Sequence, residues 1–452
     1  MTNILRKLAV IGVISLLWLQ SCVRGFPAAH FPEAELAEEQ LSDYIIAYCW
    51  QDPNGRQSRT TPEDKEVVIV VSSADSKKRI VIRHALNLPS KYLSDFVIYK
   101  NGCVELGDSF LMYAGYTLNW RPNTDELVYT EGSDRSLTDL NSRVLASNFT
   151  AINSDFVKWV DGYRNYFWIP RGIYWSSDGD KLAVLGRDVS LPSSSGDNIW
   201  VLGGNKSYFK RVTNFNRAGD FIANAAWSGD GSMLAVEYRK QSGIGIIPLN
   251  EDSRVKSYAN VTSETFEELS DYWPYAFTSW LQLIYDSKNI DFNSYISISS
   301  PPVWVNNDEQ IIFAASDSED RGTLFIVNSD GSGLEPFLPD IPGLIFMPRL
   351  STDGRTLAFV RYPGWKSRSQ VEIATIDIVT REVNSLVVLS ARDNNSTLFI
   401  SGMNWSPDGK YLMFSSNHAG ESDIYIMTSD GESWRNITAE IDGNVAGPIW
   451  KP

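Results

Sequence analysis

Residues 404–414 read Asn404-Trp405-Ser406-Pro407-Asp408-Gly409-Lys410-Tyr411-Leu412-Met413-Phe414, and this stretch predicts a β-hairpin. Pro407 presets φ for the second position of a type I turn, and Gly409 can adopt the left-handed conformation that closes the loop. The apolar run that follows the turn is typical of a buried strand. By itself the stretch indicates only one hairpin.

The same pattern recurs along the chain, and the recurrence indicates an architecture. An apolar residue, usually Trp, precedes a turn and then an apolar run, at Trp120, Trp175, Trp227, Trp304, Leu350 and Trp405, with a partial copy ending at Trp450. Four of the turns carry a glycine suited to the left-handed conformation: Gly179, Gly231, Gly354 and Gly409. The copies lie 45 to 55 residues apart, with one gap of 77. This period is typical of a β-propeller with four-stranded blades, whereas chance hairpins of a β-sandwich would not keep the spacing.

The repeats resemble those of TolB-like propellers, a WD-repeat-like class. Two stretches carry the family's next strand, Leu324–Gly331 and Ile424–Gly431, and the second is followed by Trp434-Arg435-Asn436-Ile437-Thr438. The resemblance covers regular repeats over residues 117–452. It implies an all-β propeller but no particular activity, since these motifs are structural. We expect seven blades, with six as the alternative.

The two ends of the domain, residues 43–452, are expected to meet in one blade. Strand-like runs occur at Tyr44–Trp50, Val67–Val71, Arg79–Leu86 and Phe96–Lys100. We expect the last three to be outer strands and Ala446–Trp450 to be their inner strand, so that pairing of the N- and C-terminal strands closes the ring. The alternative is six blades with a small separate N-terminal β unit.

The N-terminus is similar to a bacterial lipoprotein signal. Arg6 and Lys7 precede a 12-residue apolar run, and Leu19-Gln20-Ser21-Cys22 follows it. The resemblance implies a signal peptide over residues 1–21 and lipidation of Cys22 by acyl chains such as palmitate. The Pro- and Glu-rich composition that follows predicts a tether over residues 22–42, which stays flexible or forms a short acidic helix. An ordinary cleaved signal and an uncleaved anchor are the alternatives, although the run is too short to span a bilayer. The expected location is the cell envelope, outside the cytoplasmic membrane or in the outer membrane facing the periplasm.

Two further cysteines, Cys49 and Cys103, lie near strands of the same expected blade. An extracytoplasmic location permits a disulfide between them. Two buried free thiols are the alternative, because sequence does not supply the geometry that a bridge needs.

Composition argues against several classes of function. The net charge of −15 disfavours a nucleic-acid surface, which needs clustered Lys and Arg. The three histidines, His30, His84 and His418, show no metal-ligand spacing, and no phosphate-binding or nucleophile-elbow motif occurs. We therefore expect no cofactor or metal and assign no catalytic residue. Oligogalacturonate lyases resemble this propeller, but their His-based metal cluster has no counterpart here.

Binding is expected at two aromatic insertions, over about residues 133–170 and 253–300. Their candidate residues are Trp159, Tyr163, Trp168, Tyr272, Trp273, Phe277 and Trp280. Exposed aromatic patches mark interaction sites, although these residues could instead form local cores. The first hypothesis is a non-enzymatic, lipid-anchored scaffold that binds a protein or glycan of the envelope. The alternative is a carbohydrate-active or hydrolytic enzyme with its site in the central funnel.

Overall fold

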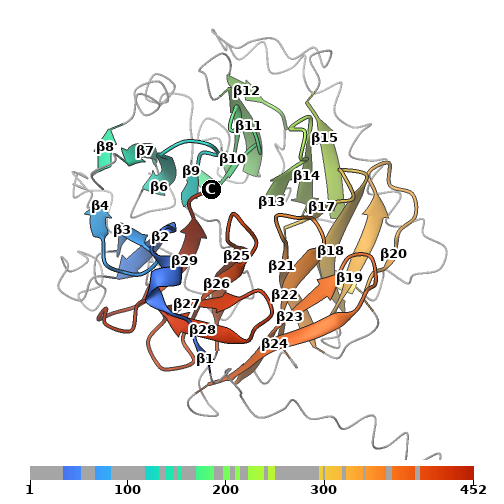
Figure 1. The fold of residues 1–452 in the computed structure, drawn as a ribbon. Helices are drawn as coiled ribbons and strands as arrows, with labels where there is room; N and C mark the ends of the chain where they lie inside the picture. The colour runs from blue at the N-terminus through green and yellow to red at the C-terminus, as the bar shows by residue number, and fades with distance from the viewer. Residues whose placement is uncertain are drawn as a thin grey trace, which may run out of the picture.

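The computed structural model describes the chain in segments that cover most of the expected repeats. They are residues 34–51, 67–82, 118–131, 139–145, 151–153, 169–187, 197–203, 209–213, 222–238, 243–249, 295–298, 301–317, 322–338, 343–362, 369–391 and 398–452. Within these ranges the strands form seven sheets, which stand around a common centre (Figure 1). The all-β propeller predicted from the repeats is confirmed.

The first four blades follow the chain in order. Blade one contains β5 (Leu118–Trp120), β6 (Glu126–Glu131), β7 (Asp139–Leu145) and β8 (Ala151–Asn153). Blade two contains β9 (Ile169–Trp175), β10 (Lys181–Arg187), β11 (Asp197–Gly203) and β12 (Phe209–Arg211). Blade three contains β13 (Ile222–Trp227), β14 (Met233–Tyr238) and β15 (Gly243–Pro248). Blade four contains β16 (Tyr295–Ile298), β17 (Val303–Val305), β18 (Gln310–Asp317), β19 (Gly322–Asn328) and β20 (Glu335–Pro336).

The last three blades include both ends of the described chain. Blade five contains β21 (Leu344–Leu350), β22 (Thr356–Tyr362), β23 (Gln370–Asp377) and β24 (Val383–Ser390). Blade six contains β25 (Ile400–Trp405), β26 (Tyr411–Ser416), β27 (Asp423–Thr428) and β28 (Ser433–Asn436), with β1 (Ala34–Glu35) added at its outer edge. Blade seven contains β29 (Val445–Trp450), β2 (Ile45–Gln51), β3 (Val67–Ser73) and β4 (Arg79–Ile82).

The ring closes in blade seven, where β29 pairs antiparallel with β2. Closure by the two ends of the chain is as predicted, but one strand assignment was wrong. The partner of β29 is Ile45–Gln51 and not Val67–Val71, which is one strand further out. The side chains of β2 alternate between the cluster shared with blade six and the cluster shared with blade one, while its two edges pair with β29 and β3. The predicted outer strand Phe96–Lys100 lies outside the described residues.

The core is divided among the contacts between blades. The described buried side chains form seven hydrophobic clusters, and each cluster joins one blade to the next around the ring. The inner strands β5, β9, β13, β17, β21, β25 and β29 also contact one another in that order. Every blade is therefore held by two neighbours, which is how a ring of small sheets supports a chain longer than a usual single core.

Residues 34–42 differ from the expected flexible tether. They contain β1 and a 3₁₀ turn, η1 (Glu38–Leu41), and the side chains of Leu36 and Leu41 are 3% and 0% exposed. Two apolar side chains in a short acidic segment suffice to dock it, since each gains free energy when it leaves water. In the described part of the chain, no helix has the length and hydropathy of a membrane span.

Candidate functional site

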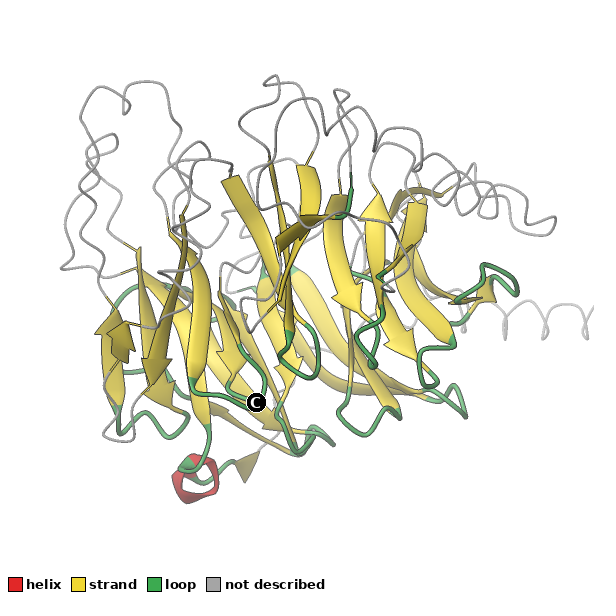
Figure 2. Ribbon diagram, turned by 90° about the horizontal axis from the view of Figure 1, so that it is seen from above, coloured by secondary structure: helices red, strands yellow, loops and turns green. Residues whose placement is uncertain are grey.

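The short turns between the first and second strands lie together at one end of the propeller, which we call the turn face (Figure 2). In blade six the Ser406 Oγ donates to Asp408 Oδ1 at 2.7 Å and accepts the backbone N–H of Tyr411 at 3.0 Å. Ser176, Ser228 and Ser351 make the same pair of bonds. The repeated Ser-x-Asp-Gly residues therefore serve the turns themselves.

The turn glycines have the left-handed backbone that their position requires. Their φ values are +72° at Gly179, +65° at Gly231, +73° at Gly354 and +73° at Gly409. A side chain at such φ values would be strained, whereas glycine adopts them without steric cost.

Several aspartate carboxylates in the turns accept hydrogen bonds from neighbouring turn residues, and these bonds keep them ionised. The Ser228 hydroxyl and backbone N–H of Ser232 lower the pKa of Asp230, and Ser351 acts in the same way on Asp353. At Asp408, burial raises the pKa, but hydrogen bonds from Lys410, Tyr44 and Ser406 outweigh it, and the net shift is downward. These carboxylates are poor general acids, because a catalytic acid must hold its proton near neutral pH.

Four of the motif tryptophans join their blade to the preceding one. The indole N–H groups donate to backbone carbonyls across the interface: Trp227 to Tyr174, Trp304 to Ala226, Trp405 to Arg349 and Trp450 to Asn404, at 2.8 to 3.2 Å. Each acceptor directly precedes the motif position of the neighbouring blade. Trp120 and Trp175 are also buried. These residues are structural, and they fix the inner strands relative to one another.

Polar contacts continue this link across the turn face. The Ser177 hydroxyl donates to the Gly229 carbonyl at 2.5 Å, and Asp308 accepts the Gly229 N–H at 2.7 Å. Lys451 of blade seven pairs with Asp125 of blade one at 2.5 Å, across the closed junction. The turn face is therefore a connected surface rather than a set of separate loops.

A group of polar side chains comes from the inner strands of blades two, three and five and from the second strand of blade three. Asn224 Nδ2 donates to Glu237 Oε2 at 2.5 Å, and both side chains are buried. Burial raises the pKa of Tyr174, and the Glu237 charge raises it further, whereas the Arg349 charge lowers it. Arg349 lies in β21 and Tyr174 in β9, so the group draws on blades two, three and five. It combines a protonated phenol, a carboxylate and a guanidinium.

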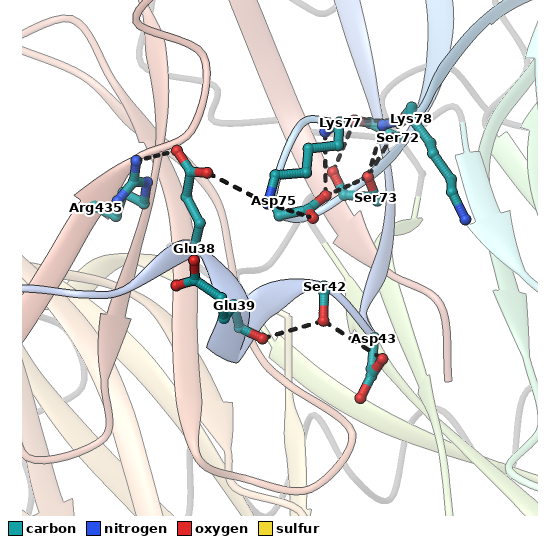
Figure 3. Close-up of polar contacts among 10 residues, drawn as sticks. All are labelled: Glu38, Glu39, Ser42, Asp43, Ser72, Ser73, Asp75, Lys77, Lys78 and Arg435. Carbon is teal, nitrogen blue, oxygen red and sulfur yellow. Dashed lines mark hydrogen bonds and ion pairs between the residues drawn. The ribbon is translucent and has the colours of Figure 1, made fainter.

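A second polar group surrounds residues 34–44, which we call the N-terminal strap (Figure 3). Glu38 pairs with Arg435 of blade six at 2.5 Å and with Lys77 of blade seven at 3.5 Å. Ser42 Oγ donates to the Glu39 carbonyl at 3.1 Å. The strap thus connects blades six and seven beneath the turn face. Residues 34–42 were expected to belong to the tether, because the Pro- and Glu-rich composition of the segment offers little to bury.

All seven binding residues expected from sequence fall outside the described residues, as do two of the cysteines. These are Trp159, Tyr163, Trp168, Tyr272, Trp273, Phe277 and Trp280, together with Cys22 and Cys103. Cys49 is buried and disulfide-bonded, and its partner also falls outside them. Pairing with Cys103 stays a prediction.

His418 is a titratable group whose surroundings the sequence did not reveal. Its ring lies 4.8 Å from that of Tyr425, and burial lowers its pKa to about 4 even though the Asp423 charge raises it. The imidazole is therefore neutral at physiological pH. This ring contact could not be predicted, because the two residues are brought together by a hairpin turn outside the repeated motif. Within the described ranges, no three metal-ligating side chains form a group that could hold an ion.

No family model matches the chain. Among solved structures, TolB from Acinetobacter baumannii is 13% identical, over 91% of this chain and 67% of that one, with a TM-score of 0.44. A Bacteroides fragilis protein proposed to be a 6-phosphogluconolactonase is 10% identical, over 90% and 98% of the two chains, with a TM-score of 0.47. An oligogalacturonate lyase in complex with manganese is 13% identical, over 58% and 63%, with a TM-score of 0.38. TolB proteins are thus among the structures that resemble this propeller, and at these identities the likeness concerns the fold alone.

Proposed function

We propose that this protein is a lipid-anchored binding scaffold of the cell envelope, which holds a protein or glycan partner outside the cytoplasmic membrane. The observation that carries the proposal is the closed ring, in which every interface between blades has its own hydrophobic cluster. A ring of this kind gives a rigid surface, and a rigid surface loses little conformational entropy when a partner binds.

The chemistry of the turn face also favours binding over catalysis. Its serines and aspartates satisfy each other and the turn backbone, and hydrogen bonding lowers the carboxylate pKa values. Such groups are held in place and ionised, so they stabilise the turns and are unsuited to donating a proton to a substrate at neutral pH.

The anchor is supported by the sequence around Cys22, where a basic segment, a short apolar run and Ser21 precede the cysteine. Several acyl chains on one cysteine give stable membrane association, whereas a single chain does not. The buried disulfide at Cys49 agrees with an oxidising compartment.

The alternative is a hydrolytic or carbohydrate-active enzyme, and one observation favours it. Tyr174, Glu237 and Arg349 come from three blades, and the charges of Glu237 and Arg349 both act on the Tyr174 phenol. A carboxylate beside a protonated phenol and a guanidinium is a combination that can move a proton or stabilise a developing charge.

The test uses the full mature chain carrying Cys22→Ala, which we expect to be soluble. Envelope extract and a glycan array are probed with this protein and with a Tyr174→Phe, Arg349→Gln version of it. A scaffold captures the same specific partner with both proteins, and neither hydrolyses the glycans it binds. Turnover by the first protein that is lost in the second would establish the alternative. Cys22→Ala protein that stayed in the membrane fraction would contradict the lipid anchor.

A further inference from the structure

The N-terminal strap is bound to the propeller along its length. β1 pairs in parallel with β28, and the Leu36 N–H donates to the Trp434 carbonyl at 2.9 Å. The Arg435 guanidinium donates to the Leu36 carbonyl at 3.0 Å and pairs with Glu38. The beginning of the strap is therefore an extra strand of blade six.

The end of the strap is held by blade seven and by the turn face. Leu41 is fully buried, and with Leu36 it belongs to the hydrophobic cluster between blades six and seven. The Tyr44 hydroxyl donates to Asp408 Oδ2 at 2.7 Å, and its ring lies 5.5 Å from those of Tyr411 and Trp450. The strap fills a core interface, and ordinary surface contacts alone do not account for its position.

This docking places the start of the folded chain at the turn face. In Figure 2, β1 and η1 lie at the same end of the molecule as the short turns. Ala34 is twelve residues after Cys22. A connection of twelve residues reaches at most about 40 Å. The longest strands of blade six have six residues and are about 20 Å long, so in an inverted molecule the connection would have to cover the height of the blade before it reached the bilayer.

We propose that the strap orients the anchored propeller, with the turn face toward the lipid bilayer and the opposite end toward the aqueous compartment. This inference rests on the proposed lipid anchor. The strap fixes where the anchored chain leaves the ring, and the short connection then limits how the ring can turn. The surface open to a large partner is the end that carries the turn between β26 and β27.

Two exposed residues of blade six give matched positions for the test. Glu432 follows β27 at the turn face, and Ala419 lies in the turn between β26 and β27 at the other end. Glu432→Cys and Ala419→Cys are labelled with a donor dye in separate samples of the lipidated full chain. The protein is reconstituted in liposomes whose headgroups carry an acceptor dye. Chain without either substitution measures the background labelling of native cysteines.

We expect stronger energy transfer from position 432 than from position 419. In a Leu36→Asp, Leu41→Asp version the difference should shrink toward zero while membrane binding persists. Arg435→Gln is the milder variant, with an intermediate difference, and it covers the case in which the double substitution prevents folding. Equal transfer from the two positions in anchored, unsubstituted protein would overturn the orientation. Loss of anchoring in that protein would instead contradict the proposed lipidation.

Discussion

The contact between blades six and seven can be tested by placing one methyl group at Gly402. This residue has a φ of +62°, and a Cβ there would lie 2.3 Å from Pro448 Cδ and 2.7 Å from Pro448 N. Pro448 belongs to β29, the strand that closes the ring. The atoms that the methyl group meets are part of a ring and a backbone, so they cannot rotate out of the way.

Gly354 supplies the matched control. Its φ is +73°, and a Cβ there would meet nothing within 4 Å. Gly354→Ala should therefore cost only the left-handed backbone strain, about 1 kcal/mol. Gly402→Ala adds overpacking against β29, which typically costs about 1–3 kcal/mol more. The expected totals are about 1 and about 2–4 kcal/mol.

The assay is urea unfolding of the full mature chain in the soluble Cys22→Ala background, followed by tryptophan fluorescence. The urea midpoints of the two variants are compared only if the free energy of unfolding falls with urea concentration at the same slope in both. A change in that slope would indicate a different unfolding process. Equal destabilisation by the two alanines would refute the reasoning, because it would mean that β25 and β29 do not approach each other as described.

Three other predictions concern the turns, the interfaces and pH. Ser406→Ala should lower the free energy of unfolding by about 1–3 kcal/mol, because it leaves the buried Tyr411 N–H without an acceptor; urea midpoints check this, and no change would show that water replaces the hydroxyl. Trp405→Phe should cost about 1–2 kcal/mol through loss of the bond to the Arg349 carbonyl, with exposed Glu432→Ala as a neutral control in the same unfolding experiment. The pKa of His418 is about 4 in the folded state and about 6.5 in the unfolded chain, so the unfolded state alone gains a proton between these values. Stability should therefore fall from pH 6.5 to pH 4, by roughly 1–2 kcal/mol once solvent screening is allowed for, and His418→Gln should abolish this slope. Below pH 4 the turn aspartates should weaken the fold further in both proteins, since their folded-state pKa values lie below the usual value. Unchanged thermal midpoints from pH 6.5 to pH 4 would contradict the burial of His418.

The repeated turns have a consequence for how the protein tolerates change. Each Ser-x-Asp-Gly turn is stabilised by its own hydrogen bonds, and each motif tryptophan contacts the preceding blade. Damage in one blade is therefore expected to act on two interfaces. In a repeat fold each unit contacts only its two neighbours, so a substitution disturbs the structure close to its own blade.

The sequence alone determined the class of the fold, the turn positions and the blade that closes the ring. Turn formation depends on residues within a few positions of one another, such as Ser406, Asp408 and Gly409. The positions of the turns can therefore be predicted from short stretches of sequence. The spacing of the Trp residues then predicts repeated sheets, because a blade cannot bury its apolar faces without neighbours.

Tertiary structure decided which of several similar strands pair with each other and which apolar side chains are buried. β2 and β3 are both apolar strands, and only the packing of the ring places β2 against β29. Leu36 and Leu41 are two apolar residues in an acidic segment, and their burial depends on a site formed by blades six and seven. Tyr174 and Arg349 are far apart in the chain and are brought together only when the ring closes. Long-range contacts of this kind arise from the geometry of the whole molecule, and no short stretch of sequence encodes them.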